Sequence, residues 1–491
     1  MALRSTIAAQ ASSEFPISQR RRPGVVLEEL FRRLMPQSFA EWLWWPVFFI
    51  CSFVSPRLTP VFDLGVVKVG SSDLLLACFA LVLLPFFFAY RRRYPRAFRW
   101  TFVPFSLFVA YALCTALIFG DYRRYDFGYQ VFPAVMAWLA VCGAFTLVSS
   151  LNKGKLDDFL FRLSCAVAAV ALAYTLAAVF NPLGLRPRVE GDPLLGIPRV
   201  SGPLGAATVL PGVFLIAASY FLCAVRRSAQ AVIAIALSCI LVAAVLLCGS
   251  RAGLIALALL AFWIAWRGAS LKPKVYVMLV IIISSVVFFQ VAAPLRYLSF
   301  QETYRMRSYE TGLRAWTHNA ATVVFGHGYG QLWPWYMHDI YLQLGEDRRY
   351  QSFLQTPFGM TAYHPHSTYI NILAETGLAG TVLFTLALAA QLLPVLRARA
   401  RATRANFLLP GLLASLVVQA FDLLLLKEFT LSATWWVFFF IMAAFYSEET
   451  VVWRRQAGGD GKLKSQVSRS LGEVRTLRGE SRLLSLHDRS K

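Results

Sequence analysis

Histidines and arginines, the side chains suited to proton transfer and to phosphate binding, gather in one polar stretch of this chain. Five of the six histidines lie between residues 318 and 366. Neutral imidazole accepts a proton near neutral pH, and a guanidinium binds phosphate oxygens through two parallel hydrogen bonds. Arg307 and Arg314 lie seven residues apart, so a helix would place both on one face, with Glu310 able to pair with either. The stretch could therefore supply a general base and an anion site.

Glycines punctuate the same stretch, which reads GHGYG at 326–330 and HPHSTYINILAETGLAG at 364–380. His366 and Glu375 are nine residues apart, about half a turn out of phase on a straight helix. We therefore expect Glu375 to hydrogen-bond locally on its helix and not to orient His366. The two glycines that follow, Gly377 and Gly380, permit close helix packing.

Further candidate ligands lie in turns elsewhere. Arg251 occupies a very tight turn, CGSRAG, between two apolar segments. An arginine at such a depth faces protein or a water-filled cavity, unless it reaches toward lipid headgroups. Arg186, Arg188 and Arg199 lie in a segment rich in Pro and Gly, as solvated loop residues or as substrate ligands. Trp335 and Tyr336 belong to an aromatic cluster that fits either a membrane interface or a sugar-stacking surface.

The elements that carry these residues are membrane spans. The chain is 57% hydrophobic and 15% charged, with a mean hydropathy of +0.56, and its apolar runs approach the roughly 20 residues that cross a bilayer. This composition predicts an all-α, polytopic integral membrane protein with about twelve transmembrane helices. The twelve expected spans lie near residues 40–55, 73–90, 101–119, 128–149, 158–180, 203–224, 229–249, 252–267, 275–293, 376–394, 406–425 and 430–446.

The net charge of +22 indicates how the protein is oriented in the membrane, since most basic residues lie between spans and no nucleic-acid-binding motif is present. The even-numbered loops are basic, which predicts that these loops and both termini are cytoplasmic. We expect a cytoplasmic N-terminal tail at 1–39, a transmembrane domain at 40–447 and a basic cytoplasmic tail at 448–491. The large loop at 295–375, between spans nine and ten, then lies outside.

Several chemistries are absent from the sequence. The eight cysteines fall within apolar runs and form no C-x-x-C pair, which argues against a disulfide framework or a zinc site. No HExxH, DxD or P-loop motif appears. We therefore expect no metal and no cofactor, and neither ATP-driven transport nor a metal-dependent nucleotide-sugar transferase.

The glycine turn, the histidine and the Glu-x-Gly that follows resemble the signature of the O-antigen ligase and polymerase superfamily of integral membrane glycosyltransferases. Ser250, Arg251 and Gly253 resemble its Ser-Arg-Gly turn. The residues that match the signature itself are Gly326, Gly328, Gly330, His366, Glu375, Gly377 and Gly380. The resemblance implies a GT-C-like fold in a bacterial inner membrane, with a large periplasmic loop.

The resemblance also implies a reaction and residue roles. The donor would be a glycan on undecaprenyl pyrophosphate, the acceptor a lipid A-core sugar, and the transfer inverting. His366 would be the base, with Arg314 and Arg251 on the pyrophosphate. From residue type and location, we also expect substrate binding by Arg199, Arg307, Arg186, Arg188, His364, Tyr336 and Trp335.

Three alternatives stay open. An O-antigen polymerase would use a second lipid-linked glycan as its acceptor, and a protein O-oligosaccharyltransferase would use a Ser or Thr. The moderate outer loop, without an added folded domain, favours the ligase. A flippase or transporter of lipid-linked glycans would need ionisable residues within the spans, and these are few, chiefly Asp422. The sequence does not name the glycan, the acceptor position or the oligomeric state.

Overall fold

The computed structural model describes part of the chain. The described residues are 36, 38–53, 60–63, 68–119, 126–180, 200, 207–224, 231–267, 303–333, 353–362, 366–398, 404–421, 425–426 and 429–448. Outside them lie both expected tails, apart from a few residues of each, the ninth predicted span and Asp422. The candidate site residues that also lie outside are Arg186, Arg188, Arg199, Trp335, Tyr336 and His364.

The described chain is mainly helical, as its composition predicts. Its helices are α3 (Phe39–Phe53), α4 (Ser71–Tyr90), α5 (Pro95–Ala97), the π-helix η1 (Phe98–Phe102), α6 (Val103–Phe119), α7 (Asp126–Ser150), α8 (Lys153–Phe180), α9 (Leu210–Ala224), α10 (Ala231–Leu247), α11 (Arg251–Arg267), α13 (Thr303–Trp316), α14 (Ala320–Phe325), α16 (Thr368–Arg397), α17 (Ala405–Gln419) and the last helix, Phe429–Glu448.

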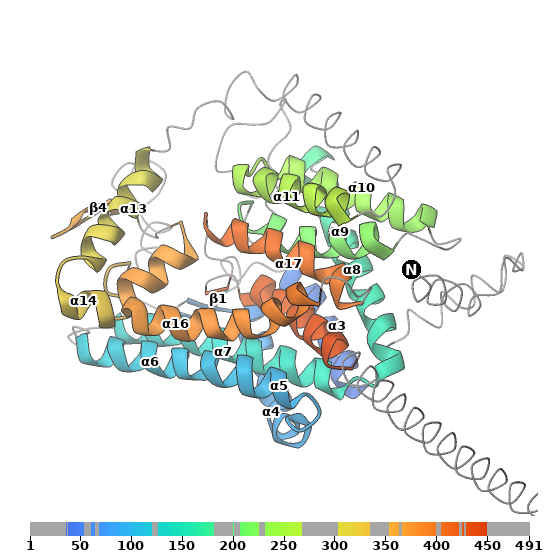
Figure 1. Cartoon of the computed structure of the whole chain (residues 1–491), viewed down its shortest axis with the longest axis horizontal. Helices are drawn as coiled ribbons and strands as arrows, with labels where there is room; N and C mark the ends of the chain where they lie inside the picture. The colour runs from blue at the N-terminus through green and yellow to red at the C-terminus, as the bar shows by residue number, and fades with distance from the viewer. Residues whose placement is uncertain are drawn as a thin grey trace, which may run out of the picture.

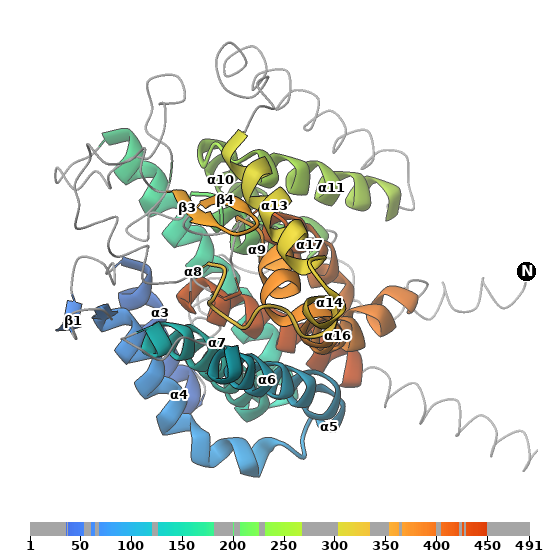
Figure 2. The ribbon, with the colours of Figure 1, turned by 90° about the vertical axis from the view of Figure 1, so that its left-hand side faces the viewer.

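Two small antiparallel hairpins, which the sequence interpretation did not include, interrupt the helices. The first pairs β1 (Pro60–Asp63) with β2 (Lys68–Gly70). The second pairs β3 (Phe353–Thr356) with β4 (Gly359–Ala362), in the register Phe353 to Ala362. β3–β4, α13 and α14 lie together over one end of the helix bundle (Figures 1 and 2). We call this the capped end.

The predicted spans recur in the structure wherever it describes them. Six helices are long and apolar enough to cross a membrane, and five shorter apolar helices, from α3 to α17, coincide with predicted spans. These eleven segments correspond to eleven of the twelve expected spans, and the remaining one falls outside the described residues. The protein is therefore a polytopic helical membrane protein.

Basic loops meet at the end opposite the cap. Arg93 donates to the Ser149 carbonyl at 2.9 Å and to Asn152 Oδ1 at 3.1 Å, which joins the second loop to the fourth. Arg404 pairs with Asp157, which joins the tenth loop to the same group. Loops that the charge pattern assigns to one side therefore lie together in space.

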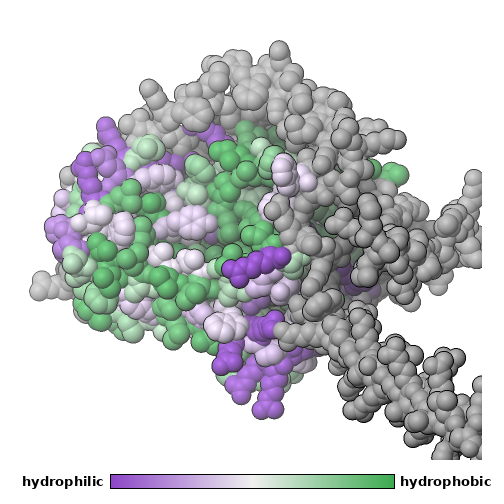
Figure 3. Space-filling model, viewed as in Figure 1, coloured by the Kyte–Doolittle hydropathy of each residue, from purple (hydrophilic) through white to green (hydrophobic). Residues whose placement is uncertain are grey.

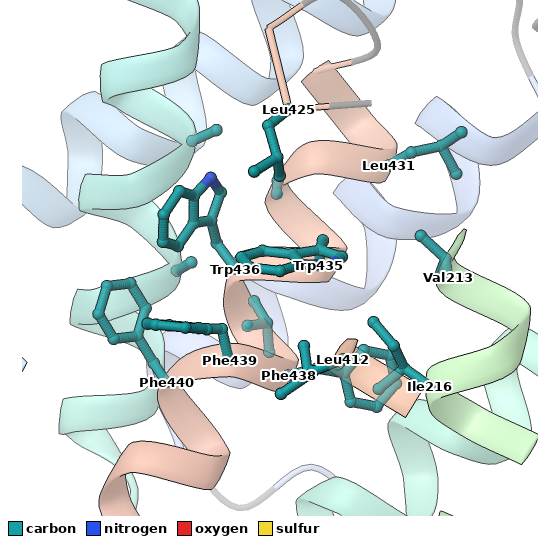
Figure 4. Packing of buried hydrophobic residues seen from close by; sticks show 14 of the residues in the cluster. Val213, Ile216, Leu412, Leu425, Leu431, Trp435, Trp436, Phe438, Phe439 and Phe440 are labelled. Atoms are coloured by element: carbon teal, nitrogen blue, oxygen red, sulfur yellow. The ribbon is translucent and has the colours of Figure 1, made fainter. Parts of the chain in front are cut away.

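The last helix forms the centre of the bundle. Of its apolar window, 89% is buried, and Trp435, Trp436, Phe439 and Phe440 form a continuous aromatic cluster (Figure 4). Trp435 Nε1 donates to Ser415 Oγ of α17 at 2.6 Å. Because nearly all of its apolar window is buried, this helix lies in the interior of the bundle.

Apolar side chains face outward along the flanks. Ile118, Val232 and Trp266 are each more than 60% exposed. Figure 3 shows hydrophobic residues over the middle of the molecule and hydrophilic ones toward its ends. Exposed apolar area of this extent is the surface that a helical bundle presents to lipid.

One buried charge pair lies within the predicted spans. Arg162 of α8 donates from Nε to Glu41 Oε1 of α3 at 2.6 Å, and both side chains are almost completely buried. The expectation that ionisable residues in the spans are chiefly Asp422 therefore has to be corrected. Local sequence patterns do not indicate this pairing, because the two residues lie 121 positions apart.

Candidate functional site

The glycine turn GHGYG docks onto a kink in α16. Gly377 has φ 62 and ψ −164 inside that helix, which interrupts it. The carbonyl oxygens of Ala374 and Glu375, just before the kink, accept hydrogen bonds from the backbone of His327 (3.1 Å) and Gly328 (2.9 Å). The two segments are therefore joined through their backbones, 47 residues apart along the chain for His327 and Ala374.

Glycine is required on both sides of this contact. A Cβ at Gly326 would lie 2.4 Å from the Glu375 carbonyl oxygen, and one at Gly377 would lie 2.4 Å from the Val324 carbonyl oxygen. Both glycines have positive φ, a region that other residues rarely adopt. The close packing expected of Gly377 is confirmed, and its partner is the glycine turn.

The Glu375 carboxylate completes the contact. It is fully buried, and its Oε1 accepts from the backbone N–H groups of Leu332 (3.1 Å) and Trp333 (3.0 Å). The expectation of local bonding on its own helix was wrong. The kink brings the end of the glycine turn to this side chain, and a buried carboxyl oxygen needs hydrogen-bond donors such as these backbone N–H groups.

Tyr329 lies inside the turn and is buried. Burial, together with the nearby charge of Glu375, raises the pKa of its phenol well above the ordinary value. Tyr329 therefore stays protonated at neutral pH and does not serve there as a proton acceptor.

His366 lies at the start of α16 in a strained conformation. Within the described ranges it is the one non-glycine residue with positive φ, at 52. Strain of this kind persists where the surroundings over-determine it, often at functional sites. Tyr309 of α13 donates its hydroxyl toward the His366 carbonyl (3.0 Å) and the Ala420 carbonyl (3.1 Å), and so ties the histidine to the end of α17.

The helix after His366 extends beyond the predicted membrane span. Ser367 caps it, accepting the Ile370 N–H at 3.3 Å, and α16 runs from Thr368 instead of residue 376. The predicted boundary coincides with the kink at Gly377. The residues on the capped side, TYINILAE at 368–375, interrupt the apolar run with Thr, Asn and Glu, which explains why the predicted span began later.

α13 carries Arg307 and Arg314 as predicted, and both are exposed. Arg314 pairs with Glu310, and their side chains are 64% and 59% exposed. Of the two arginines that could pair with Glu310, the partner is therefore Arg314. An exposed pair of this kind is weak and can exchange its carboxylate for another anion. Arg314 lies five residues after Tyr309, roughly 7.5 Å along the helix, so the helix that contacts His366 through Tyr309 also carries Arg314.

Arg251 is the first residue of α11. Only Cys248, Gly249 and Ser250 separate α10 from α11, which confirms the tight turn. Ser250 Oγ accepts the Gly253 N–H at 3.2 Å and caps the helix. Val200 donates to the Leu247 carbonyl at 3.0 Å. The residue next to Arg199 therefore lies at the turn that presents Arg251.

The packing of α9 and α17 gives their relative direction. Ser219 Oγ, late in α9, donates to the Phe407 carbonyl near the start of α17 at 2.7 Å. One turn further along α17, a Cβ at Gly411 would lie 2.5 Å from Ile216 Cα. The two helices are therefore antiparallel, and the start of α9 lies beside the end of α17.

This direction locates Arg251. A Cβ at Gly253, two residues after it, would lie 2.9 Å from Pro211 in the first turn of α9. Arg251 therefore lies at the level of the end of α17, where Ala420 meets the Tyr309–His366 group. The structure brings Arg251, Arg314 and His366 to the same end of the bundle, which is the capped end.

Two other histidines pack in the cap. His327 Nε2 lies 2.7 Å from the Ala315 carbonyl oxygen, and the rings of His318 and His327 lie 5.2 and 4.7 Å from that of Phe358. Thr311 Oγ1 donates to the Met360 carbonyl at 2.8 Å and fixes β4 against α13. These contacts hold the hairpin on the helix that carries Arg314.

Sequence reasoning missed three polar residues at this end: Tyr309, Asn371 and Gln419. Tyr309 bridges His366 to α17, and the other two are fully buried amides. A buried amide in a predicted span was the available signal for Gln419. Among the described residues, no three His, Cys, Asp or Glu side chains gather as a metal site would require.

These features define a multi-pass α-helical membrane protein with a polar, arginine- and histidine-bearing site at one end of its bundle. Residues 233–385 match the family described as O-antigen ligase. The matched segment includes Arg251, Arg314, His366 and the glycine turn. No curated protein matches the chain.

Proposed function

We propose that this protein is a glycosyltransferase of the O-antigen ligase type. It would move a glycan from undecaprenyl pyrophosphate to a hydroxyl of a lipid A-core sugar, at the periplasmic face of a bacterial inner membrane. The observation that supports the proposal is that Arg251, Arg314 and His366 all come from the matched family segment and belong to elements that reach the same end of the bundle.

His366 is the proposed general base. The acceptor hydroxyl oxygen attacks the anomeric carbon, and its proton passes to the imidazole, while the bond from that carbon to the pyrophosphate oxygen breaks. A single displacement of this kind inverts the anomeric carbon. The Tyr309 hydrogen bond and the Ser367 cap support this role because they fix the backbone from the His366 carbonyl into the first turn of α16.

Arg314 and Arg251 are the proposed partners of the leaving pyrophosphate. The departing group takes the bonding electron pair and gains negative charge, which guanidinium groups stabilise as it develops. Arg314 is suited to this role because its present partner is an exposed carboxylate that an anion can replace. Arg307, Arg199, Arg186, Arg188, His364, Tyr336 and Trp335 are proposed to bind the substrates.

A reconstituted transfer assay tests the proposal. Purified protein in detergent receives a radiolabelled lipid-linked glycan, with lipid A-core, a second lipid-linked glycan or a Ser/Thr peptide as the acceptor. EDTA is present throughout, because the proposed mechanism uses no metal. We expect product with lipid A-core only, and none with the His366→Gln variant.

The other acceptors discriminate the alternatives. Extension of the second lipid-linked glycan would identify a polymerase, and glycosylation of the peptide a protein O-oligosaccharyltransferase. Movement of the labelled donor across a proteoliposome membrane without transfer to any acceptor would identify a flippase. Product that forms only after Mg²⁺ or Mn²⁺ is added back would contradict the metal-free mechanism.

A further inference from the structure

Two buried amide side chains lie at the capped end without hydrogen bonds. Asn371 of α16 and Gln419, the last residue of α17, are both completely buried. Within the described part of the chain, neither the oxygen nor the nitrogen of either amide has a hydrogen-bond partner. Buried amides are normally paired, because burying them unpaired forfeits their hydrogen bonds to water. Two such side chains at one helix junction therefore indicate missing ligand groups.

The backbones of both residues lie close to His366. The Asn371 N–H donates to the Ser367 carbonyl at 3.1 Å, one residue from the histidine. Gln419 directly precedes Ala420, whose carbonyl shares the Tyr309 hydroxyl with the carbonyl of His366.

A second contact closes the same junction. The Tyr369 hydroxyl of α16 donates to the Leu416 carbonyl in the last turn of α17 at 2.8 Å. The first turns of α16, which carry Asn371, and the last turn of α17, which carries Gln419, therefore meet next to His366.

The chemistry of the two side chains selects the ligand class. Each amide offers two N–H donors and a carbonyl acceptor and carries no charge. A sugar hydroxyl both donates and accepts, so neighbouring hydroxyls of a sugar ring match an amide pair. A pyrophosphate accepts only and is charged, and the guanidinium groups suited to it are on α11 and α13.

We propose that Asn371 and Gln419 bind hydroxyl groups of the acceptor sugar and hold it against His366. The acceptor follows from the location, because the hydroxyl that loses its proton must lie next to the base. This inference rests on the proposed glycosyl transfer. It assigns the amides a binding role, while proton transfer stays with His366.

Near-isosteric apolar variants test the proposal. Gln419→Met and Asn371→Leu remove the hydrogen bonds and keep most of the volume. The matched control is Gln391→Met, at the opposite end of α16, where Nε2 donates to the Arg96 carbonyl at 3.3 Å. Loss of one or two neutral hydrogen bonds predicts an acceptor KM raised about tenfold or more, with the donor KM unchanged. The control keeps both KM values.

Thermal unfolding in detergent supplies a readout that does not depend on transfer. Core oligosaccharide freed of its lipid should raise the unfolding temperature of the wild type and of Gln391→Met, and should not raise that of Gln419→Met. A shift that persists in Gln419→Met, or no shift in the wild type, overturns the inference. If Asn371→Leu fails to fold, the Gln419→Met result decides alone.

The two proposals fail in different ways. Oligosaccharide binding that depends on the amides, without transfer to any acceptor, would refute the ligase function and keep the sugar site. Normal transfer with unchanged acceptor KM in both variants would keep the ligase function and refute the sugar site. The two amides would then be hydrogen-bonded to water or left unpaired.

Discussion

His366 combines two properties that rarely coincide in one residue, a side chain able to accept a proton and a backbone with positive φ. We expect His366→Gln to lower turnover by about 10²–10⁴-fold, since glutamine forms hydrogen bonds but takes no proton. His366→Ala should be similarly damaged, and His364→Ala should be affected less. Turnover is measured beside donor binding, which should persist. Gln activity within a few-fold of wild type would leave His366 only a positioning role.

Arginine differs from lysine in that its guanidinium can donate two parallel hydrogen bonds to a phosphate. Arg314→Ala and Arg251→Ala should each reduce transfer strongly, through loss of charge opposite the leaving group. Arg314→Lys should restore only part of it, because an ammonium lacks the planar fork that binds two oxygens at once. Initial rates at saturating acceptor measure the effect. Near-normal rates in both alanine variants would refute the pyrophosphate role.

Glu375 is expected to matter for folding. Glu375→Ala leaves the Leu332 and Trp333 N–H groups buried without their acceptor, at a cost of about 1–3 kcal/mol each. Glu375→Gln retains an acceptor oxygen and should cost much less. The unfolding temperature in detergent should therefore fall in the order wild type, Gln, Ala. Equal destabilisation by both substitutions would show that the charge, and not the acceptor, is what the turn requires.

At the scale of elements, the contact between the glycine turn and the α16 kink determines how the cap is held. Gly377→Ala puts a Cβ 2.4 Å from the Val324 carbonyl oxygen and forces a non-glycine residue to φ 62, so we expect destabilisation of about 1–3 kcal/mol or more and loss of transfer. Gly154→Ala in α8 is the control, since a Cβ there meets nothing within 4 Å. It should be neutral in an unfolding measurement. A Gly377→Ala protein as stable as the control would mean that the turn can dock without the kink.

The sequence predicted elements better than their contacts. Apolar runs located every described span, because burial in lipid imposes a length and a composition that can be recognised within one segment. Sequence-based prediction failed where a residue's role depends on a distant segment. Glu375 was assigned a local bond because a straight helix was assumed, and the kink at Gly377 arises from contact with a turn some 50 residues earlier.

The candidate site residues also divide into those that the sequence indicates and those that it does not. His366, Arg314 and Arg251 could be chosen from residue type, spacing and resemblance, all of which are properties of the sequence. Tyr309, Asn371 and Gln419 could not, because the role of a tyrosine or an amide depends on which helix packs against it. The Arg162–Glu41 pair was missed for the same reason.

At the scale of the whole molecule, the two ends of the bundle differ in charge and in what they carry. Arg93, Arg96 and Arg404 gather at one end with the second, fourth and tenth loops, while α13, α14 and β3–β4 cover the other. Basic loops are retained in the cytoplasm, so the capped end should face the periplasm, where lipid-linked glycans and lipid A-core would meet.

Single cysteines test this orientation in a background freed of the eight native ones. Ala321→Cys in α14 and Arg92→Cys after α4 are both at exposed positions, at opposite ends of the bundle. A maleimide that cannot cross the membrane should label Ala321→Cys in intact spheroplasts and should reach Arg92→Cys only after lysis. Labelling of both after lysis shows that each thiol is reactive. The reverse pattern would show that the site faces the cytoplasm, away from the proposed acceptor. It would overturn the ligase proposal together with the predicted topology.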